Sequence, residues 1–209
     1  MTRLLAIAAL VGCAASARAD EKTTAETGYR QLWNRSAAYG LFSESGALPA
    51  FHLGVGRELP GLPLEARLAY DYGGASARAF GSQDAGLTVH EALLGARYYL
   101  RRGHYLEPTG ELDVGFAAGN ATLAGSTFQR GGWAFGALVS GLAGVDATLM
   151  DRGAGAVTIS GALQVGYTLA TALAFAPAAT PGATPTTNAA LGHLPLSGWT
   201  WQLSGVARF

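Results

Sequence analysis

The sequence predicts an all-β protein in which eight antiparallel strands close into an up-and-down barrel. Three observations lead to this prediction: apolar and polar residues alternate with a period of two, glycine is abundant, and charged residues are scarce. Glycine accounts for 30 of the 209 residues, about twice the share of about 7% in ordinary soluble domains. Charged residues make up 13%, about half the usual share of about 25%. The 14 basic and 14 acidic side chains balance, which argues against a nucleic-acid-binding protein.

The first 19 residues have the three parts of a secretory signal peptide. Arg3 gives a positive start, residues 4–11 form an apolar core, and residues 17–19 (Ala-Arg-Ala) form a small-residue cleavage site. The only cysteine, Cys13, would leave with this peptide, so the exported chain could form no disulfide. Residues 10–13 also resemble a lipoprotein cleavage box in which Cys13 becomes lipidated. Both interpretations predict export.

Residues 20–35 are polar with little periodicity, and we expect a periplasmic N-terminal segment, a tether that ends in the start of a strand. The barrel is expected over residues 36–209. Its alternation is clearest at the end of the chain, where Trp199, Trp201 and Leu203 fall on one face. The eight predicted strands are residues 36–43, 51–58, 64–72, 90–100, 106–118, 133–147, 157–169 and 199–209.

Period two also describes a soluble sandwich, so the membrane prediction needs further observations. The chain has one lysine, Lys22, whereas soluble sheets usually protect their edges with several. Glycine and alanine interrupt the charged face, which suits a narrow interior, and aromatic residues cluster at strand ends as in an interfacial girdle. The girdle candidates are Tyr98, Tyr99, Trp133, Phe135, Trp199 and Trp201. A transmembrane barrel requires five apolar residues to point outward: Leu68, Leu94, Leu112, Val165 and Leu203.

The opposite strand faces carry charges that an eight-stranded barrel would enclose, because its interior is just wide enough for side chains to fill. We interpret them as a structural network of salt bridges, with a proton- or cation-conducting path as the alternative. Acids outnumber bases in this set, so some acids must lie at a wet rim or be protonated, or Arg101 and Arg102 must reach in. The predicted interior network is Glu65, Arg67, Asp71, Glu91, Arg97, Glu107, Glu111, Asp113, Asp146 and Arg208.

The connections between the predicted strands alternate in length, as they do in outer-membrane barrels. Short turns are expected at residues 59–63, 101–104 and 150–155. Long outer loops, exposed for surface interaction, are expected at residues 73–86, 119–130 and 175–197, whereas the first outer loop, residues 44–49, is short. This alternation places both chain ends in the periplasm.

These segments resemble the small bacterial outer-membrane β-barrels of the OmpA/OmpX type over residues 36–209. The most specific match is the C-terminal strand, where Trp201, Leu203, Ala207 and Phe209 fit the assembly signal of the family and Gly205 departs from it. The resemblance implies recognition by the barrel assembly machinery, contact with outer-membrane lipid, and a monomer in the bacterial outer membrane. We expect a structural or surface-interaction role without a cofactor, and no general pore, because side chains fill the interior of an eight-stranded barrel.

Two other functions stay open. A lipid-modifying enzyme of the lipid A deacylase or acyltransferase type would need His52 or His90 at the lipid boundary beside a hydroxyl and a carboxylate. The four histidines show no metal-binding spacing, so neither a catalytic nor a metal site is predicted. A secreted soluble barrel that holds an apolar ligand, as lipocalins do, would instead require the apolar faces to point inward.

Overall fold

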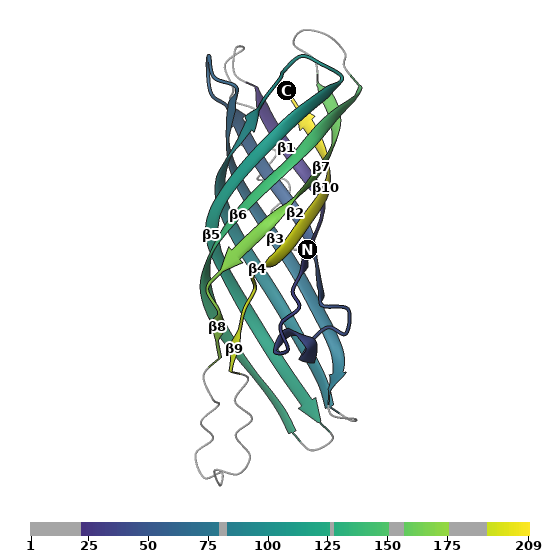
Figure 1. The fold of residues 1–209 in the computed structure, drawn as a ribbon, viewed down its shortest axis with the longest axis vertical. Coiled ribbons are helices and arrows are strands. Elements are labelled where there is room, and N and C mark those ends of the chain that lie inside the picture. Colours follow the sequence, from purple (N-terminus) through teal and green to yellow (C-terminus); the bar gives the residue numbers. More distant parts are fainter. Residues whose placement is uncertain (1–21, 80–82, 126–127, 151–156, 176–191) are drawn as a thin grey trace, which may run out of the picture.

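The computed structural model describes residues 22–79, 83–125, 128–150, 157–175 and 192–209. The expected signal peptide and Cys13 lie outside these residues. Eight antiparallel strands form a closed barrel in the order β1-β10-β7-β6-β5-β4-β3-β2, which confirms the predicted fold (Figure 1). The barrel strands are β1 (Thr23–Trp33), β2 (Ala47–Glu58), β3 (Leu64–Ala79), β4 (Gln83–Tyr99), β5 (Leu106–Gly125), β6 (Phe128–Met150), β7 (Thr158–Ala170) and β10 (Gly198–Arg208).

The barrel has two different ends. At the turn end, short connections after β2 and β4 use glycines with positive φ, Gly61 at 72° and Gly103 at 77°, a conformation that other residues adopt at a cost. The start of β1 and the last residue of the chain lie side by side there, since Thr23 N donates to Phe209 O at 2.9 Å. At the loop end lie a short 3-10 helix, η2 (Tyr39–Leu41), and a two-stranded ribbon of β8 (Leu173–Ala174) and β9 (His193–Leu194).

The first strand differs from the prediction. Strand β1 lies at Thr23–Trp33, where a tether was expected, and residues 36–43 form a bend with η2 instead of a strand. The alternation in β1 escapes notice because its inward face carries Glu26 and Arg30 among small residues. Tyr39 and Phe42 are three residues apart and both buried, which is the spacing of a 3-10 turn rather than a strand.

Two of the expected outer loops are also strands for most of their length. Strand β3 runs on to Ala79 and β4 begins at Gln83. In the same way, β5 runs on to Gly125 and β6 begins at Phe128. Figure 1 shows these hairpins extending beyond the other strands at the loop end. The glycine- and alanine-rich sequence hides the alternation, but Ala85, Leu87 and Val89 are buried in turn along β4. The wall is therefore tall on the β3–β6 side and low on the β7-β10-β1-β2 side.

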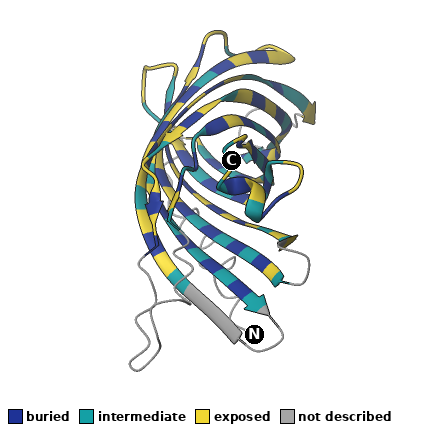
Figure 2. Cartoon of the chain, turned by 60° about the horizontal axis from the view of Figure 1, so that its bottom comes forward, coloured by how far each residue is buried: buried dark blue, intermediate teal, exposed yellow. Residues whose placement is uncertain are grey.

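The outer face of the barrel is apolar. Leu68, Leu94, Leu112, Val165 and Leu203 all point outward, with 53% to 62% of each residue exposed. Figure 2 shows the alternation of exposed and buried residues along the strands. In a soluble barrel these side chains would form the core, so their position contradicts the lipocalin-like alternative and fits a wall surrounded by lipid. No helix among the described residues is long and apolar enough to cross a membrane.

Candidate functional site: a charged interior beneath an apolar cap

A network of charged side chains fills the barrel toward its turn end. All ten predicted network residues are buried, as expected from their positions on the inward faces of the strands. Sequence reasoning missed three further members, Glu26 and Arg30 on β1 and His52 on β2. The first two were missed because β1 was interpreted as a tether. Among the buried residues that the structure describes, eight carboxyl groups face four guanidinium groups and His52.

Arg97 lies at the centre of this network and is fully buried. Its Nε donates to Glu111 Oε2 at 2.8 Å and its Nη2 to Glu26 Oε2 at 2.9 Å. A third carboxylate, Asp146, lies 3.7 Å from Nη1. Arg67 bridges the same two glutamates, at 2.5 Å from Glu26 Oε2 and in close contact with Glu111. The Arg97 guanidinium thus contacts carboxylates from three strands, β1, β5 and β6.

Arg208 closes the network at the turn end. It donates to Glu107 at 2.7 Å and to Asp146 at 2.8 Å, and its guanidinium lies 5.0 Å from the centre of the Tyr99 ring. Arg102 stacks on the same ring at 4.3 Å and pairs with Glu58 at 2.6 Å. Arg102 therefore lies at the rim, and its partner Glu58 is not one of the predicted network residues.

A second cluster lies next to the Arg97 group, around Asp71. Arg30 Nη1 donates to Asp71 Oδ2 at 2.8 Å, and His52 Nδ1 lies 2.5 Å from Asp71 Oδ1. Glu91 and Asp113 form no ion pair within the described residues. The excess of carboxyl groups leaves the interior net negative unless protons or cations are held there. Unpaired buried carboxylates would favour such neutralisation, because an isolated buried charge costs several kcal/mol.

The barrel interior toward the loop end is apolar, a feature that the sequence analysis did not predict. The inner faces of β4, β5 and β6 present Leu87, Val89, Leu123 and Leu138, all buried. Segments at the loop end pack against this wall from inside. We call them the apolar cap: Tyr39, Phe42, Leu173, Phe175, Leu194 and Leu196, each at most 5% exposed.

Two glycines make room for the apolar cap. A side chain at Gly119 would collide with Leu173, and one at Gly136 would meet Thr171 and Leu173. The ribbon therefore lies directly on the inner surface of β5 and β6. The charged network and the apolar cap fill successive levels of the same lumen.

The predicted surface residues lie on the outer face with one exception. Tyr98, Trp133, Phe135 and Trp199 are between 46% and 74% exposed. Tyr99, expected in the girdle, instead points inward and donates to Glu65 Oε2 at 2.7 Å, because neighbouring residues of a strand face opposite sides. The proposed assembly-signal residues Trp201, Leu203, Ala207 and Phe209 alternate along the outward side of β10.

Neither candidate histidine gathers the groups that a lipid-modifying enzyme needs. His90 is on the outer face, with Tyr70 Oη 2.6 Å from its Nδ1 and the Trp133 ring 5.8 Å away, but no described carboxylate contacts it. His52 contacts Asp71 but lies inside the barrel. Within the described part of the chain, no cluster of three or more histidine, cysteine or acidic residues could hold a metal ion.

Eight antiparallel strands, a closed wall with an apolar outer face and a charged lumen define the fold of small outer-membrane β-barrels. Solved structures of outer-membrane proteins share this fold. The attachment invasion locus protein Ail of Yersinia pestis has 12% identity and a TM-score of 0.54, over 91% of this chain and 99% of that chain. The outer membrane protein OprG of Pseudomonas aeruginosa has 13% identity and a TM-score of 0.54, over 92% and 97%. No family model and no curated protein sequence matches the chain.

Proposed function

We propose that the protein is an integral protein of the bacterial outer membrane, closed to diffusion, with a structural or surface-interaction role. The observation that carries this proposal is the double filling of the lumen, by the charged network and by the apolar cap. A pore needs a continuous wet path, and buried ion pairs such as Arg97–Glu111 at 2.8 Å fill part of the lumen that such a path would cross.

The two ends of the barrel support an orientation. Short turns face the periplasm in outer-membrane barrels and longer segments face outward, so we place the turn end in the periplasm and the loop end outside. This orientation is the one expected for a chain exported by a cleaved signal peptide and assembled, as a monomer, through the C-terminal strand ending in Phe209. Lipid of the outer membrane would then surround the apolar face.

A surface role rests on the tall hairpins. The β3–β4 hairpin extends beyond the low side of the barrel and carries Arg78 and Asp84 near its tip, both more than three-quarters exposed and 3.7 Å apart. Charged, strand-stiffened projections offer a rigid contact surface. A catalytic role has no comparable support among the described residues, where neither His52 nor His90 has both a hydroxyl and a carboxylate beside it at the lipid boundary.

Conductance measurements test the closed lumen. We expect the protein, reconstituted into planar bilayers, to show no discrete current steps. In vesicles loaded with a pH-sensitive dye, an imposed pH gradient is expected to decay no faster than in protein-free vesicles. Stable current steps would contradict the closed barrel, and fast proton entry alone would support the proton-path alternative. A general porin, reconstituted in parallel, is the positive control.

A further inference from the structure

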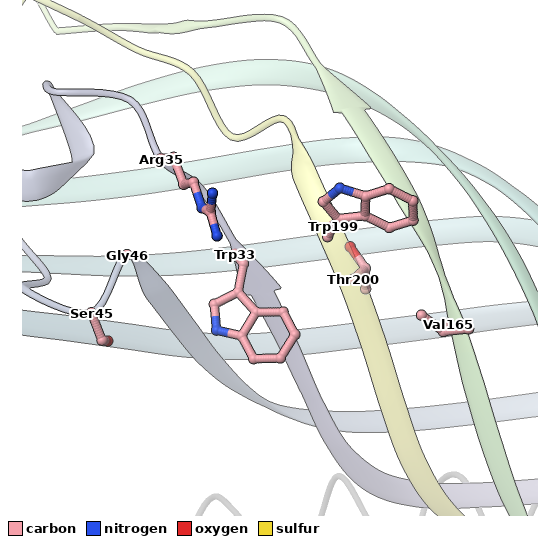
Figure 3. A pocket seen from close by; sticks show the side chains of 7 residues that line it. All are labelled: Trp33, Arg35, Ser45, Gly46, Val165, Trp199 and Thr200. Atoms are coloured by element: carbon pink, nitrogen blue, oxygen red, sulfur yellow. The ribbon is translucent and has the colours of Figure 1, made fainter.

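A pocket of about 580 Å³ lies on the low side of the wall at the loop end, outside the lumen network. Its residues come from β1, β7 and β10 and from the connection between β1 and β2, as Figure 3 shows. The pocket is lined by Trp33, Arg35, Ser45, Gly46, Val165, Trp199 and Thr200. Neither the charged network nor the apolar cap accounts for it.

The polarity of the pocket changes along the barrel axis. Val165 lies deepest in the apolar band, on the strand beside Trp201. Trp33 and Trp199 are paired across β1 and β10 closer to the loop end, and both are exposed. Arg35 and Ser45 lie beyond them, past the ends of the strands. An anionic lipid has the same order of groups: apolar chains, an interfacial region that tryptophan favours, and a charged headgroup.

Among the described residues that line the pocket, Arg35 is the one that carries a charge. Its neighbours fix its backbone: Asn34 N donates to Gly46 O at 2.8 Å, and Ser36 N donates to Asn34 Oδ1 at 2.8 Å. Asn34 Nδ2 also contacts Pro195 O, which ties this connection to the segment that carries β9. The Arg35 side chain is exposed and forms no ion pair within the described residues.

Gly46 completes this arrangement with a φ of 69°. A side chain there would collide with the Asn34 carbonyl. Glycine therefore allows the end of the connection, at Gly46, to approach its beginning, at Asn34, beside Arg35. Figure 3 shows the Arg35 side chain between Gly46 on one side and Trp199 on the other. These contacts fix the backbone on both sides of Arg35 and place its exposed side chain beyond Trp33 and Trp199, toward the loop end.

We propose that this pocket binds the phosphorylated headgroup of an outer-leaflet lipid. Arg35 would donate to the phosphate, because a guanidinium is suited to two parallel hydrogen bonds with it. Trp33 and Trp199 would pack against the headgroup sugar or the first carbons of the chains, and Val165 against an acyl chain. A dissolved phosphate would use Arg35 alone and would leave the aromatic wall without a partner. The inference rests on the proposed location in the outer membrane.

Binding of lipid A by the whole folded protein tests this proposal. The protein is refolded in an uncharged sugar detergent, and tryptophan fluorescence is followed while lipid A is added. We expect saturable binding that Arg35→Ala weakens by about tenfold, equivalent to about 1.4 kcal/mol, and that Arg35→Lys weakens less. Arg78→Ala removes the same charge from the exposed hairpin at the same end and should bind like the wild type.

Each other outcome has a defined meaning. Equal affinity of the Arg35→Ala and Arg78→Ala variants, or unchanged affinity for lipid A stripped of its phosphates, would overturn the site. Displacement of lipid A by millimolar inorganic phosphate would assign the pocket to dissolved phosphate and would overturn the lipid assignment. The same samples are run on gels with and without boiling. A protein that stays soluble without detergent and shows no heat-dependent migration contradicts the membrane location itself, whereas a heat-modifiable protein without Arg35-dependent binding contradicts only this proposal.

Discussion

Replacing Arg97 with alanine is expected to cost about 3–5 kcal/mol of folding free energy, because it leaves buried carboxylates without a counter-charge. The guanidinium contacts Glu26, Glu111 and Asp146 at 2.9, 2.8 and 3.7 Å and is fully buried. Arg97, on β4, thus links its own strand to β1, β5 and β6. The measurement is a urea titration in detergent micelles, followed by the loss of the folded, faster-migrating band on unboiled gels.

Two control variants separate the network from a general loss of charge. Arg78→Ala removes an exposed arginine whose pair with Asp84 is 77% and 78% exposed, so it should change stability by no more than about 1 kcal/mol. Arg97→Lys keeps the charge but loses the forked geometry, and an intermediate midpoint is expected. An Arg97→Ala midpoint equal to that of Arg78→Ala would mean that the lumen is hydrated and open, contrary to the structure.

An arginine introduced at Leu112 should destabilise the folded protein in a membrane by about 2–4 kcal/mol, the cost of a charged side chain at the middle of the lipid-facing wall. Leu112 is 59% exposed on β5, between the inward-facing Glu111 and Asp113 of the charged network. If the outer face met water, the same substitution would fall within about 0.5 kcal/mol of the wild type. Urea titration of the protein folded into lipid vesicles provides the measurement.

The matched control is Leu149→Arg. Leu149 is 68% exposed near the turn-end terminus of β6, where an arginine can reach the interface and the cost falls to about 0–1 kcal/mol. A large loss at Leu112 together with a small one at Leu149 is the depth dependence expected of a lipid-facing wall. Similar small effects at both positions would indicate an outer face in water.

Most of the barrel could be predicted because the strand period is a local property of the chain. Residues 64–72 and 157–169 alternate clearly, and the structure contains both within β3 and β7. The ten inward charges followed from the same alternation. By contrast, β1 was missed because Thr23–Trp33 carries charges on its inward face and small or polar residues on much of its outward face. Its place is set by pairing with β10, which is distant in sequence.

The apolar cap could not be predicted, because it is a tertiary feature of segments that lack regular periodicity. Leu173 and Leu194 face the same wall from opposite ends of a long connection, and nothing local links them. One weak signal was present: Tyr39 and Phe42, three residues apart, have the spacing of a single buried turn. The extensions of the tall hairpins are regular strands, but they could not be predicted because their many glycine and alanine residues give little difference in polarity between the two strand faces.

Cell fractionation followed by gel migration with and without boiling tests most directly whether lipid surrounds the apolar wall and the charges are enclosed. We expect recovery in the outer-membrane fraction and a folded band that shifts only on boiling, because a closed barrel with an enclosed ionic network resists detergent. Recovery in the soluble periplasm or the medium, with one band under both conditions, would contradict this expectation.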